Sequence, residues 1–259
     1  MSEFASQLGK LTSTLSCCDV DDDANLEVEL DAVEPRPVSE LKQQLLEAGN
    51  TFRTTPAQRQ EFVAAFKRYH AEVGEKMYLE YRTTIEAIKA AHPEVAHIPT
   101  DDLIALRGWT SGDYILVQNA LDMPKPEQFA DALPYLRAIM SAYHALPKSF
   151  IYTGTVYTGE RQTAEWVNQR YKVGETITNW RFFAASETVE GKWPDCNVNW
   201  DSESVHGKRI SLFSERPKEL EVLFVPATQQ NTLSLTVKKG TEHRTFPDID
   251  IRQKEVVEI

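Results

Sequence analysis

The sequence predicts an α+β protein, in which a helical first part is followed by a part made mostly of strands. Two observations carry this prediction. Up to about residue 147, apolar residues recur at three- and four-residue steps, which is the spacing of a buried helix face. From Lys148 on, the spacing changes to the alternation typical of strands. Such an order of elements favours helices that pack against a sheet or a sandwich.

The charge of the chain is concentrated at one end. Of the formal net charge of −11, residues 1–34 contribute −8, through nine acids and one base, and the other 225 residues contribute −3. A charge run of this kind, followed by prolines, is typical of a solvated segment. We therefore expect a disordered acidic segment over 1–38 and one folded domain over 39–259, with a helical lobe over 39–147 and a β-core over 148–259. Neither part has the basic surplus that binding to nucleic acid needs.

Each helix is predicted from a start signal that apolar periodicity follows. The predicted helices begin, in chain order, at Ser39, Pro56, Thr100, Ser111 and Pro126. The second of them is expected to be long, because its apolar stripe continues from Phe62 to Ile88 before His92-Pro93 ends it. Such a stripe is more typical of a core than of a cofactor site.

Six segments of the second part are predicted to be strands, because β-branched and aromatic residues alternate in them between turn residues. They are 150–159, 175–186, 208–214, 220–228, 231–239 and 255–259, with one helix over 163–171. We find no internal repeat and no heptad series.

Cysteine and histidine patterns give no sign of a metal site. Cys17, Cys18 and Cys196 match neither a disulfide framework nor a zinc pattern, and none of the six histidines has a partner at metal-ligand spacing. Phosphate-binding loops and nucleophile elbows are also missing. We expect no metal, and no role follows for Cys17 and Cys18.

The chain contains no apolar run of 18 residues, so we expect no transmembrane segment. Its start, MSEFASQLGKLTSTLSCC, lacks the apolar core of a classical signal peptide. The serine- and threonine-rich composition is compatible with a specialised secretion signal and equally with a frayed terminus, and both interpretations stay open.

The segment 207–228 contains the residues most suggestive of chemistry. Glu219 and Glu221 are alternate residues entering a predicted strand, so both carboxylates are expected on one face. Two acids so close repel each other, which raises the proton affinity of one of them unless a cation lies between them. Such a pair suits the stabilisation of a sugar cation together with the handling of a proton. A solvent-facing polar strand edge would give the same pattern.

The segment GKRISLFS, a short loop and then ELEVLFVPAT together resemble the C-terminal active-site motif of mono-ADP-ribosyltransferases of the Arg-Ser-Glu toxin class. Three earlier segments resemble that family's motifs in the same order: LRGWTSGDYILVQNAL, LPKSFIYTGTVYTGE and YKVGETITNWRFFAASET. The resemblance covers about residues 100–259. It implies a helical lobe packed on a two-sheet β-sandwich core, and a glycosyl-type transferase that consumes NAD without a metal.

The resemblance also implies roles for single residues. Glu221 would be the catalytic glutamate, and Glu219 would orient and deprotonate an acceptor guanidinium. Tyr157, Thr158 and Gly159 fall in the first cofactor-binding motif. Ser186 falls in the serine motif, and Phe183 is the aromatic residue expected near the nicotinamide.

Two motif positions depart from the family. Its first strand carries an arginine that holds the NAD phosphates, where this chain has Thr158, and a hydroxyl offers neither the charge nor the paired donors of a guanidinium. Arg161 and Arg181 are candidates to replace that arginine. The serine motif is reached only after a one-residue slip, which brings Ser186-Glu187-Thr188 into its place.

Two functions therefore remain open. In the first, the protein is an NAD-dependent mono-ADP-ribosyltransferase that modifies a target protein at arginine. It would be a bacterial effector or toxin that a specialised system secretes into the cytosol of a host or target cell; a chain that is not exported would be cytoplasmic. In the second, the fold no longer uses NAD in the usual way and binds an arginine-containing partner through the cleft of Glu219 and Glu221. An arginine within pyrophosphate reach of Glu221 would favour the first function. A third interpretation is an unrelated α+β domain with coincidental strand motifs.

Overall fold

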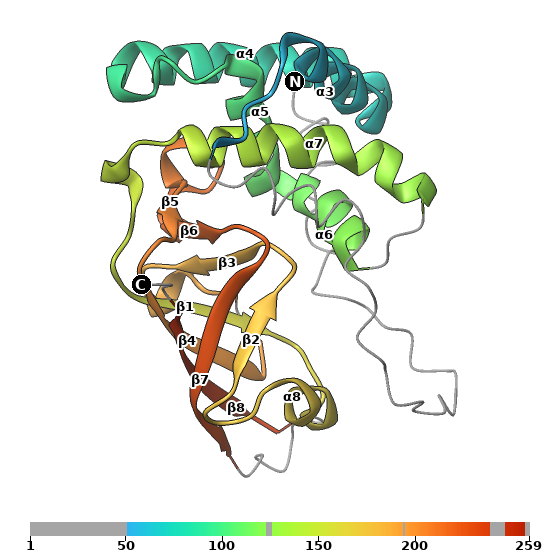
Figure 1. The fold of residues 1–259 in the computed structure, drawn as a ribbon. Coiled ribbons are helices and arrows are strands. Elements are labelled where there is room, and N and C mark those ends of the chain that lie inside the picture. The colour runs from blue at the N-terminus through green and yellow to red at the C-terminus, as the bar shows by residue number, and fades with distance from the viewer. Residues whose placement is uncertain (1–50, 123–125, 194, 239–246, 257–259) are drawn as a thin grey trace, which may run out of the picture.

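The computed structural model describes residues 51–122, 126–193, 195–238 and 247–256. The helix predicted from Ser39 and the acidic segment 1–38 lie outside the described residues. Figure 1 shows two layers: helices gather at one end of the molecule, and strands form the other end, with the helix α8 beyond them. None of the helices in the described ranges has the length and apolar content of a membrane span.

The helical layer, called the helical lobe, contains five α-helices within the described residues. They are α3 (Pro56–Tyr69), α4 (Gly74–Ala91), α5 (Thr100–Gly108), α6 (Tyr114–Asp122) and α7 (Pro126–Ala145). Their buried faces meet in one large hydrophobic cluster, in which Phe62 and Phe66 of α3 contact the ring of Tyr135 of α7. The starts predicted at Pro56, Thr100 and Pro126 are confirmed.

The prediction of a single long helix up to His92 is wrong, because this segment forms two helices, α3 and α4, with a break between them. Ala71 has a left-handed φ of 47° in the 3₁₀ turn between them (Ala71–Val73). A β-carbon on Gly74, the first residue of α4, would lie 2.4 Å from the carbonyl oxygen of Lys67, so only glycine permits this close approach. The apolar stripe continues across the break because both helices face the same core.

A five-residue π-helical turn (Trp109–Asp113) joins α5 to α6. Gly112 has a φ of 157° inside this turn, and the helix predicted from Ser111 begins three residues later than expected. Asp113 is buried, and its carboxylate lies 3.1 Å from Nε2 of His70. This pair joins the turn after α5 to the C-terminal end of α3.

The strand layer, called the β-core, contains eight strands within the described residues. They are β1 (Gly154–Glu160), β2 (Thr176–Asn179), β3 (Phe183–Ser186), β4 (Val198–Ser204), β5 (Lys208–Arg209), β6 (Glu221–Phe224), β7 (Thr228–Val237) and β8 (Ile249–Glu255). The helix α8 (Ala164–Arg170) lies where it was predicted. β4 has no counterpart among the predicted strands, and β8 begins earlier than predicted.

Two predicted strands are shorter than expected for identifiable reasons. The segment 175–186 is divided into β2 and β3, because the backbone of Phe182 hydrogen-bonds to the side chain of Gln118 in α6 instead of to a neighbouring strand. The segment 208–214 is a strand only over β5, because a 3₁₀ turn (Ser211–Phe213) follows and buries its last residue against the helical lobe.

The eight strands are hydrogen-bonded in the order β2-β7-β8-β4-β1-β3-β6-β5. The link between β1 and β3 is the single pair of Tyr157 with Ser186, whereas β1 pairs with β4 along its whole length. The sheet therefore has a five-stranded part and a three-stranded part, which is close to the predicted two-sheet arrangement. Phe183 packs against apolar clusters of both parts. The α+β class is confirmed.

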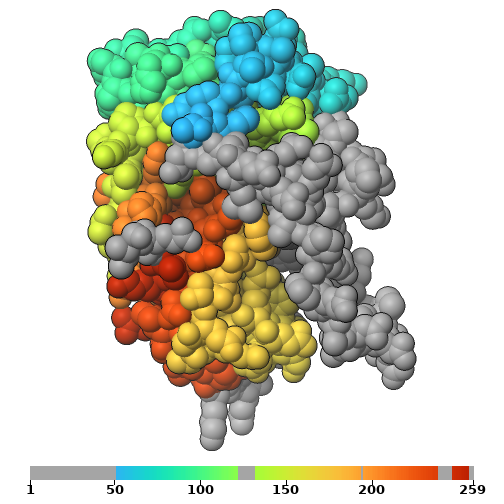
Figure 2. Space-filling model, in the orientation of Figure 1, coloured from blue at the N-terminus to red at the C-terminus, as the bar shows by residue number. Residues whose placement is uncertain are grey.

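The helical lobe lies on the three-stranded part of the sheet, as Figure 1 and the space-filling view in Figure 2 show. Ile210 and Leu223 of the β-core belong to the same hydrophobic cluster as the lobe helices. Nζ of Lys208 donates to the carbonyl oxygens of Tyr143 and Leu146 at the end of α7, at 2.8 and 3.0 Å. Burial lowers the pKa of Lys208 to about 8. These contacts join the end of α7 to β5, which pairs with β6.

Candidate functional site

Glu219 and Glu221 flank a sharp change of backbone direction. Glu219 ends a 3₁₀ turn (Pro217–Glu219), Leu220 has left-handed φ and ψ of 47° and 48°, and Glu221 is the first residue of β6. The expectation that both acids lie along one strand is therefore wrong for Glu219. Their charges still interact: burial raises the pKa of Glu221 to about 7, the Trp109 hydrogen bond opposes this rise, and the charge of Glu219 adds to it.

Trp109 of the helical lobe donates a hydrogen bond from Nε1 to Oε1 of Glu221, at 2.9 Å. Its indole is buried, and its ring centroid lies 4.8 Å from that of Phe182. The side-chain amide of Gln118 donates to the Phe182 carbonyl at 2.8 Å and accepts from the Phe182 N–H at 3.2 Å. Glu221 is thus held between the two layers of the molecule.

The strand register determines which side chains share the face of Glu221. Ser186 of β3 lies opposite Glu221, and Tyr157 of β1 lies opposite Ser186. Directly paired residues project to the same face of a sheet, so these three side chains form a row. Two of the predicted cofactor-binding residues, Tyr157 and Ser186, are therefore on the face of Glu221.

The chain itself closes off the hydroxyl of Ser186. Ser186 is 3% exposed, and its Oγ accepts the backbone N–H of Thr188 at 3.0 Å. A 3₁₀ turn (Val189–Gly191), called the covering turn, packs over it. A β-carbon on Gly191 would lie 2.1 Å from Ser186 Oγ and 2.6 Å from the carbonyl oxygen of Glu219. The covering turn therefore lies against both Ser186 and the backbone of the acid pair.

Two other predicted cofactor-binding residues project away from this row. Thr158 follows Tyr157 along β1 and pairs with Trp200, so its side chain lies on the opposite face of the sheet. Phe183 pairs with Phe224, and their ring centroids are 5.4 Å apart on that same opposite face. The sheet therefore does not bring Thr158 and Phe183 to Glu221.

Gly159 and Arg161 lie against the loop that precedes β4. A β-carbon on Gly159 would lie 2.8 Å from the β-carbon of Cys196. Nε of Arg161 donates to the backbone carbonyl of Asp195 at 3.1 Å. Arg181 lies in the bend between β2 and β3 and is partly buried.

Sequence reasoning missed three residues at the site, namely Trp109, Gly191 and Arg216. Nη1 of Arg216 lies 3.5 Å from Oε1 of Glu219, and both side chains are exposed. Trp109 lies 112 positions from Glu221 in the sequence, so no local pattern connects the two residues. For Arg216, its place three residues before an acid is a signal that could have been used.

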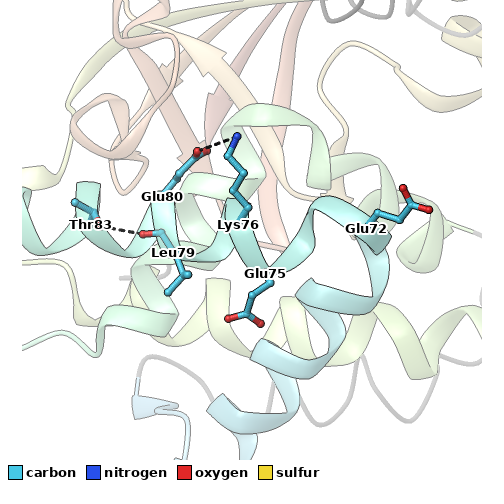
Figure 3. Close-up of a pocket in the computed structure, with 6 residues that line it drawn as sticks. All are labelled: Glu72, Glu75, Lys76, Leu79, Glu80 and Thr83. Atoms are coloured by element: carbon cyan, nitrogen blue, oxygen red, sulfur yellow. Dashed lines mark hydrogen bonds and ion pairs between the residues drawn. The ribbon is translucent and has the colours of Figure 1, made fainter. Parts of the chain in front are cut away.

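No group of three or more His, Cys, Asp or Glu side chains that could hold a metal comes together within the described ranges. A shallow groove lies on the surface of the helical lobe, along α4 and the turn before it, and neither Glu219 nor Glu221 lines it (Figure 3). It is lined by Glu72, Glu75, Lys76, Leu79, Glu80 and Thr83. Lys76 and Glu80 form an exposed ion pair across one turn of α4, at 3.7 Å. This groove is acidic at its surface and has one exposed apolar side chain, Leu79.

Neither the protein-family models nor the curated proteins contain a match to the chain. Among solved structures, the type III effector XopAI from Xanthomonas axonopodis pv. citri, in a form with 70 N-terminal residues removed, is 38% identical in sequence. The similarity covers 84% of this chain and 95% of that chain, with a TM-score of 0.74.

Two ADP-ribosyltransferases are similar at lower identity. HopU1 of Pseudomonas syringae pv. Tomato DC3000 is 16% identical over 79% of this chain and 99% of that chain, with a TM-score of 0.62. Vis of Vibrio splendidus, in a complex with agmatine, is 21% identical over 72% of this chain and 86% of that chain, with a TM-score of 0.51. At these identities the likeness concerns the fold alone.

Proposed function

Since the chain belongs to the family of the type III effector XopAI and has the fold of ADP-ribosyltransferases, we propose that it recognises an arginine side chain of a partner protein through Glu219 and Glu221. The resemblance found in the sequence is confirmed in that the chain is similar to an effector and has the fold of ADP-ribosyltransferases. The proposed partner is a protein of a host or target cell, which the effector meets after a specialised system has secreted it into the cytosol. The folded domain over 39–259 would carry this recognition.

The observation that carries the proposal is a difference in exposure: the chain covers the hydroxyl of Ser186, whereas the neighbouring carboxylates of Glu219 and Glu221 are partly exposed. The covering turn lies on the Ser186 hydroxyl, whereas the side chain of Glu219 is 39% exposed and Glu221 is partly exposed. Thr158, which stands where the family has its phosphate-binding arginine, projects to the other face of the sheet. In this arrangement neither Thr158 nor the Ser186 hydroxyl is available beside Glu221 to hold NAD, whereas two carboxylates remain accessible.

Two neighbouring carboxylates suit a guanidinium for electrostatic and geometric reasons. A guanidinium keeps its positive charge at any relevant pH and presents several N–H donors in one plane. Because burial and Glu219 raise the pKa of Glu221 to about 7, Glu221 gains most from a cation that restores its ionised form. Charge-assisted hydrogen bonds to such a carboxylate are stronger than those between neutral groups.

Two further observations support a guanidinium as the bound group. Arg216 of this chain already places Nη1 3.5 Å from Oε1 of Glu219, so this carboxylate interacts with a guanidinium within the chain. The Vis structure, which shares the fold, is a complex with agmatine, itself a guanidine compound. Agmatine is therefore a suitable small probe for this chain.

Calorimetric titration of the full chain with agmatine and with a short arginine-containing peptide tests the proposal. We expect both to bind, and an otherwise identical lysine peptide to bind more weakly, because an ammonium lacks the planar set of donors. The double variant Glu219→Ala/Glu221→Ala should lose the heat of binding for both probes.

A matched control is available in the groove of Figure 3. Glu72→Ala/Glu75→Ala removes two acids from the same protein but from a groove that neither Glu219 nor Glu221 lines. We expect this variant to bind like the wild type. Equal loss in both double variants would point to bulk charge, and unchanged binding without Glu219 and Glu221 would refute the proposal.

A second candidate function is that of an NAD-dependent mono-ADP-ribosyltransferase that modifies a target protein at arginine. The observation that favours it is the position of Glu221 opposite Ser186, with Glu219 two residues before it. In that case Glu221 would stabilise the developing sugar cation and Glu219 would orient the acceptor guanidinium. Transfer of label from NAD to a protein of a host-cell lysate, lost in Glu221→Gln, would support this function.

A further inference from the structure

Trp109 reaches Glu221 from the other layer of the molecule. It is the first residue of the π-helical turn after α5, and its Nε1 lies 2.9 Å from Oε1 of Glu221. The indole is 3% exposed, so this hydrogen bond is shielded from water. A neutral donor in such a place holds a carboxylate without neutralising its charge.

Contacts on several sides prevent the indole from turning away. The ring of Phe182 lies 4.8 Å from it, and the ring of Tyr114 lies 6.0 Å from it. The turn that carries it is closed by Thr110, whose hydroxyl donates to the carbonyl of Arg107, and by Ser111, whose hydroxyl donates to the carbonyl of Gly108, both at 2.8 Å. The orientation of Trp109 is therefore a property of the folded helical lobe.

We propose that Trp109 is a positioning residue: its indole N–H fixes one oxygen of the Glu221 carboxylate and so aims the other oxygen at the arginine side chain of the partner. The inference rests on the proposed function in one respect, namely that Glu221 meets a guanidinium. The helical lobe thereby takes part in recognition through the β-core, although Trp109 itself does not touch the partner.

The charged groups around Glu221 determine what the loss of the indole would do. Glu219 is the acid whose charge acts on Glu221, and Arg216 is paired with Glu219. The Trp109 hydrogen bond favours the ionised form of Glu221, whereas burial and Glu219 oppose it. Trp109→Phe should therefore raise the pKa of Glu221 by about one unit, since hydrogen bonds to charged groups are worth about that much.

The test follows the side-chain indole resonances of the full chain by NMR between pH 5 and pH 9. We expect one indole N–H signal, assigned to Trp109 by its loss in Trp109→Phe, to shift with a midpoint near pH 7. In Glu221→Gln the same signal should stay constant over this range. An indole signal of Trp109 that does not titrate, or that titrates unchanged in Glu221→Gln, would overturn the proposal.

A second measurement separates positioning from general stability. The pH dependence of agmatine binding should have its midpoint about one unit higher in Trp109→Phe than in the wild type. Trp166→Phe, the same exchange at the partly buried tryptophan of α8, should leave the midpoint where it is. An equal midpoint in wild type and Trp109→Phe would contradict a positioning role. If the indole titrates with Glu221 but no guanidinium binds, the proposed function fails and the Trp109–Glu221 coupling stands.

Discussion

Gly191 packs against Ser186 so closely that no larger residue fits between them. A β-carbon at position 191 would lie 2.1 Å from Ser186 Oγ and 2.9 Å from its Cβ, whereas real side chains do not approach below about 3 Å. The covering turn is therefore built around the absence of a side chain at this position. The same turn lies against the carbonyl oxygen of Glu219, so it contacts both Ser186 and the backbone of the acid pair.

Gly191→Ala should destabilise the protein, because the new methyl group must displace either the covering turn or Ser186. Overpacking of this kind costs about 1–3 kcal/mol of the free energy of unfolding. Urea denaturation of the variant measures the loss. Glu190→Ala, at an exposed position in the same turn, should stay within about 0.5 kcal/mol of the wild type. Equal stability of Gly191→Ala and the wild type would show that the turn is not seated on Ser186.

Glu221→Gln should be more stable than the wild type at pH 8, and this advantage should be smaller at pH 4. The pKa of Glu221 is raised from 4.5 to about 7 in the folded protein. Between pH 4.5 and pH 7, the folded chain therefore keeps a proton on Glu221 that the unfolded chain has lost. Stability of the wild type therefore falls as the pH rises through this window, by about 3 kcal/mol in total. Glutamine does not titrate and avoids this loss.

Urea denaturation of wild type and Glu221→Gln at pH 4 and pH 8 checks this effect. The difference in unfolding free energy between the two proteins should grow from pH 4 to pH 8 in favour of the variant. Glu203→Gln serves as control, because the side chain of Glu203 in β4 is 47% exposed. A difference between wild type and Glu221→Gln that is independent of pH would mean that folding leaves the pKa of Glu221 unchanged.

Arg216→Gln should strengthen binding of agmatine. Arg216 occupies Glu219 within the chain, and a guanidinium from outside has to compete with it. An exposed ion pair of this kind contributes at most about 1 kcal/mol, so the gain should be no more than about fivefold. Lys218→Gln removes a neighbouring positive charge from the same turn and controls for net charge. Weaker binding after Arg216→Gln would contradict this competition and indicate that Arg216 supports the bound group.

Binding of the guanidinium probe should become tighter as the pH rises towards 7 and then level off. The ionised form of Glu221 is the one that attracts the cation, and its population grows up to tenfold per pH unit below the pKa. Calorimetric titrations at pH 5, 6, 7 and 8 measure this dependence. Glu221→Gln should bind weakly at every pH, and a wild-type affinity that falls as the pH rises would exclude Glu221 as the attracting group.

The types of the elements could be predicted from the sequence because their local signals agree with the fold. α3 begins at Pro56 as predicted, after a capping box formed by Thr55, and α8 begins after Thr163 as predicted. The break after α3 could not be predicted, because both sides of it continue one apolar stripe. It arises from the contact of Gly74 with Lys67, which exists only after the two helices have packed.

Part of the candidate site was also accessible from the sequence. The acid pair could be found because Glu219 and Glu221 are neighbours in a recognisable motif. The row on their face could not, because it depends on strand register, and a shift of one residue moves Thr158 instead of Tyr157 to that face. Trp109 joins the site only through the packing of the helical lobe on the β-core.

The most direct test of the account is a calorimetric titration of the full chain with NAD, followed by one with agmatine under the same conditions. We expect no heat and no shift in melting temperature at millimolar NAD, and measurable binding of agmatine that disappears in Glu219→Ala/Glu221→Ala. Binding of NAD with release of nicotinamide, abolished by Glu221→Gln, would contradict it and establish the transferase instead.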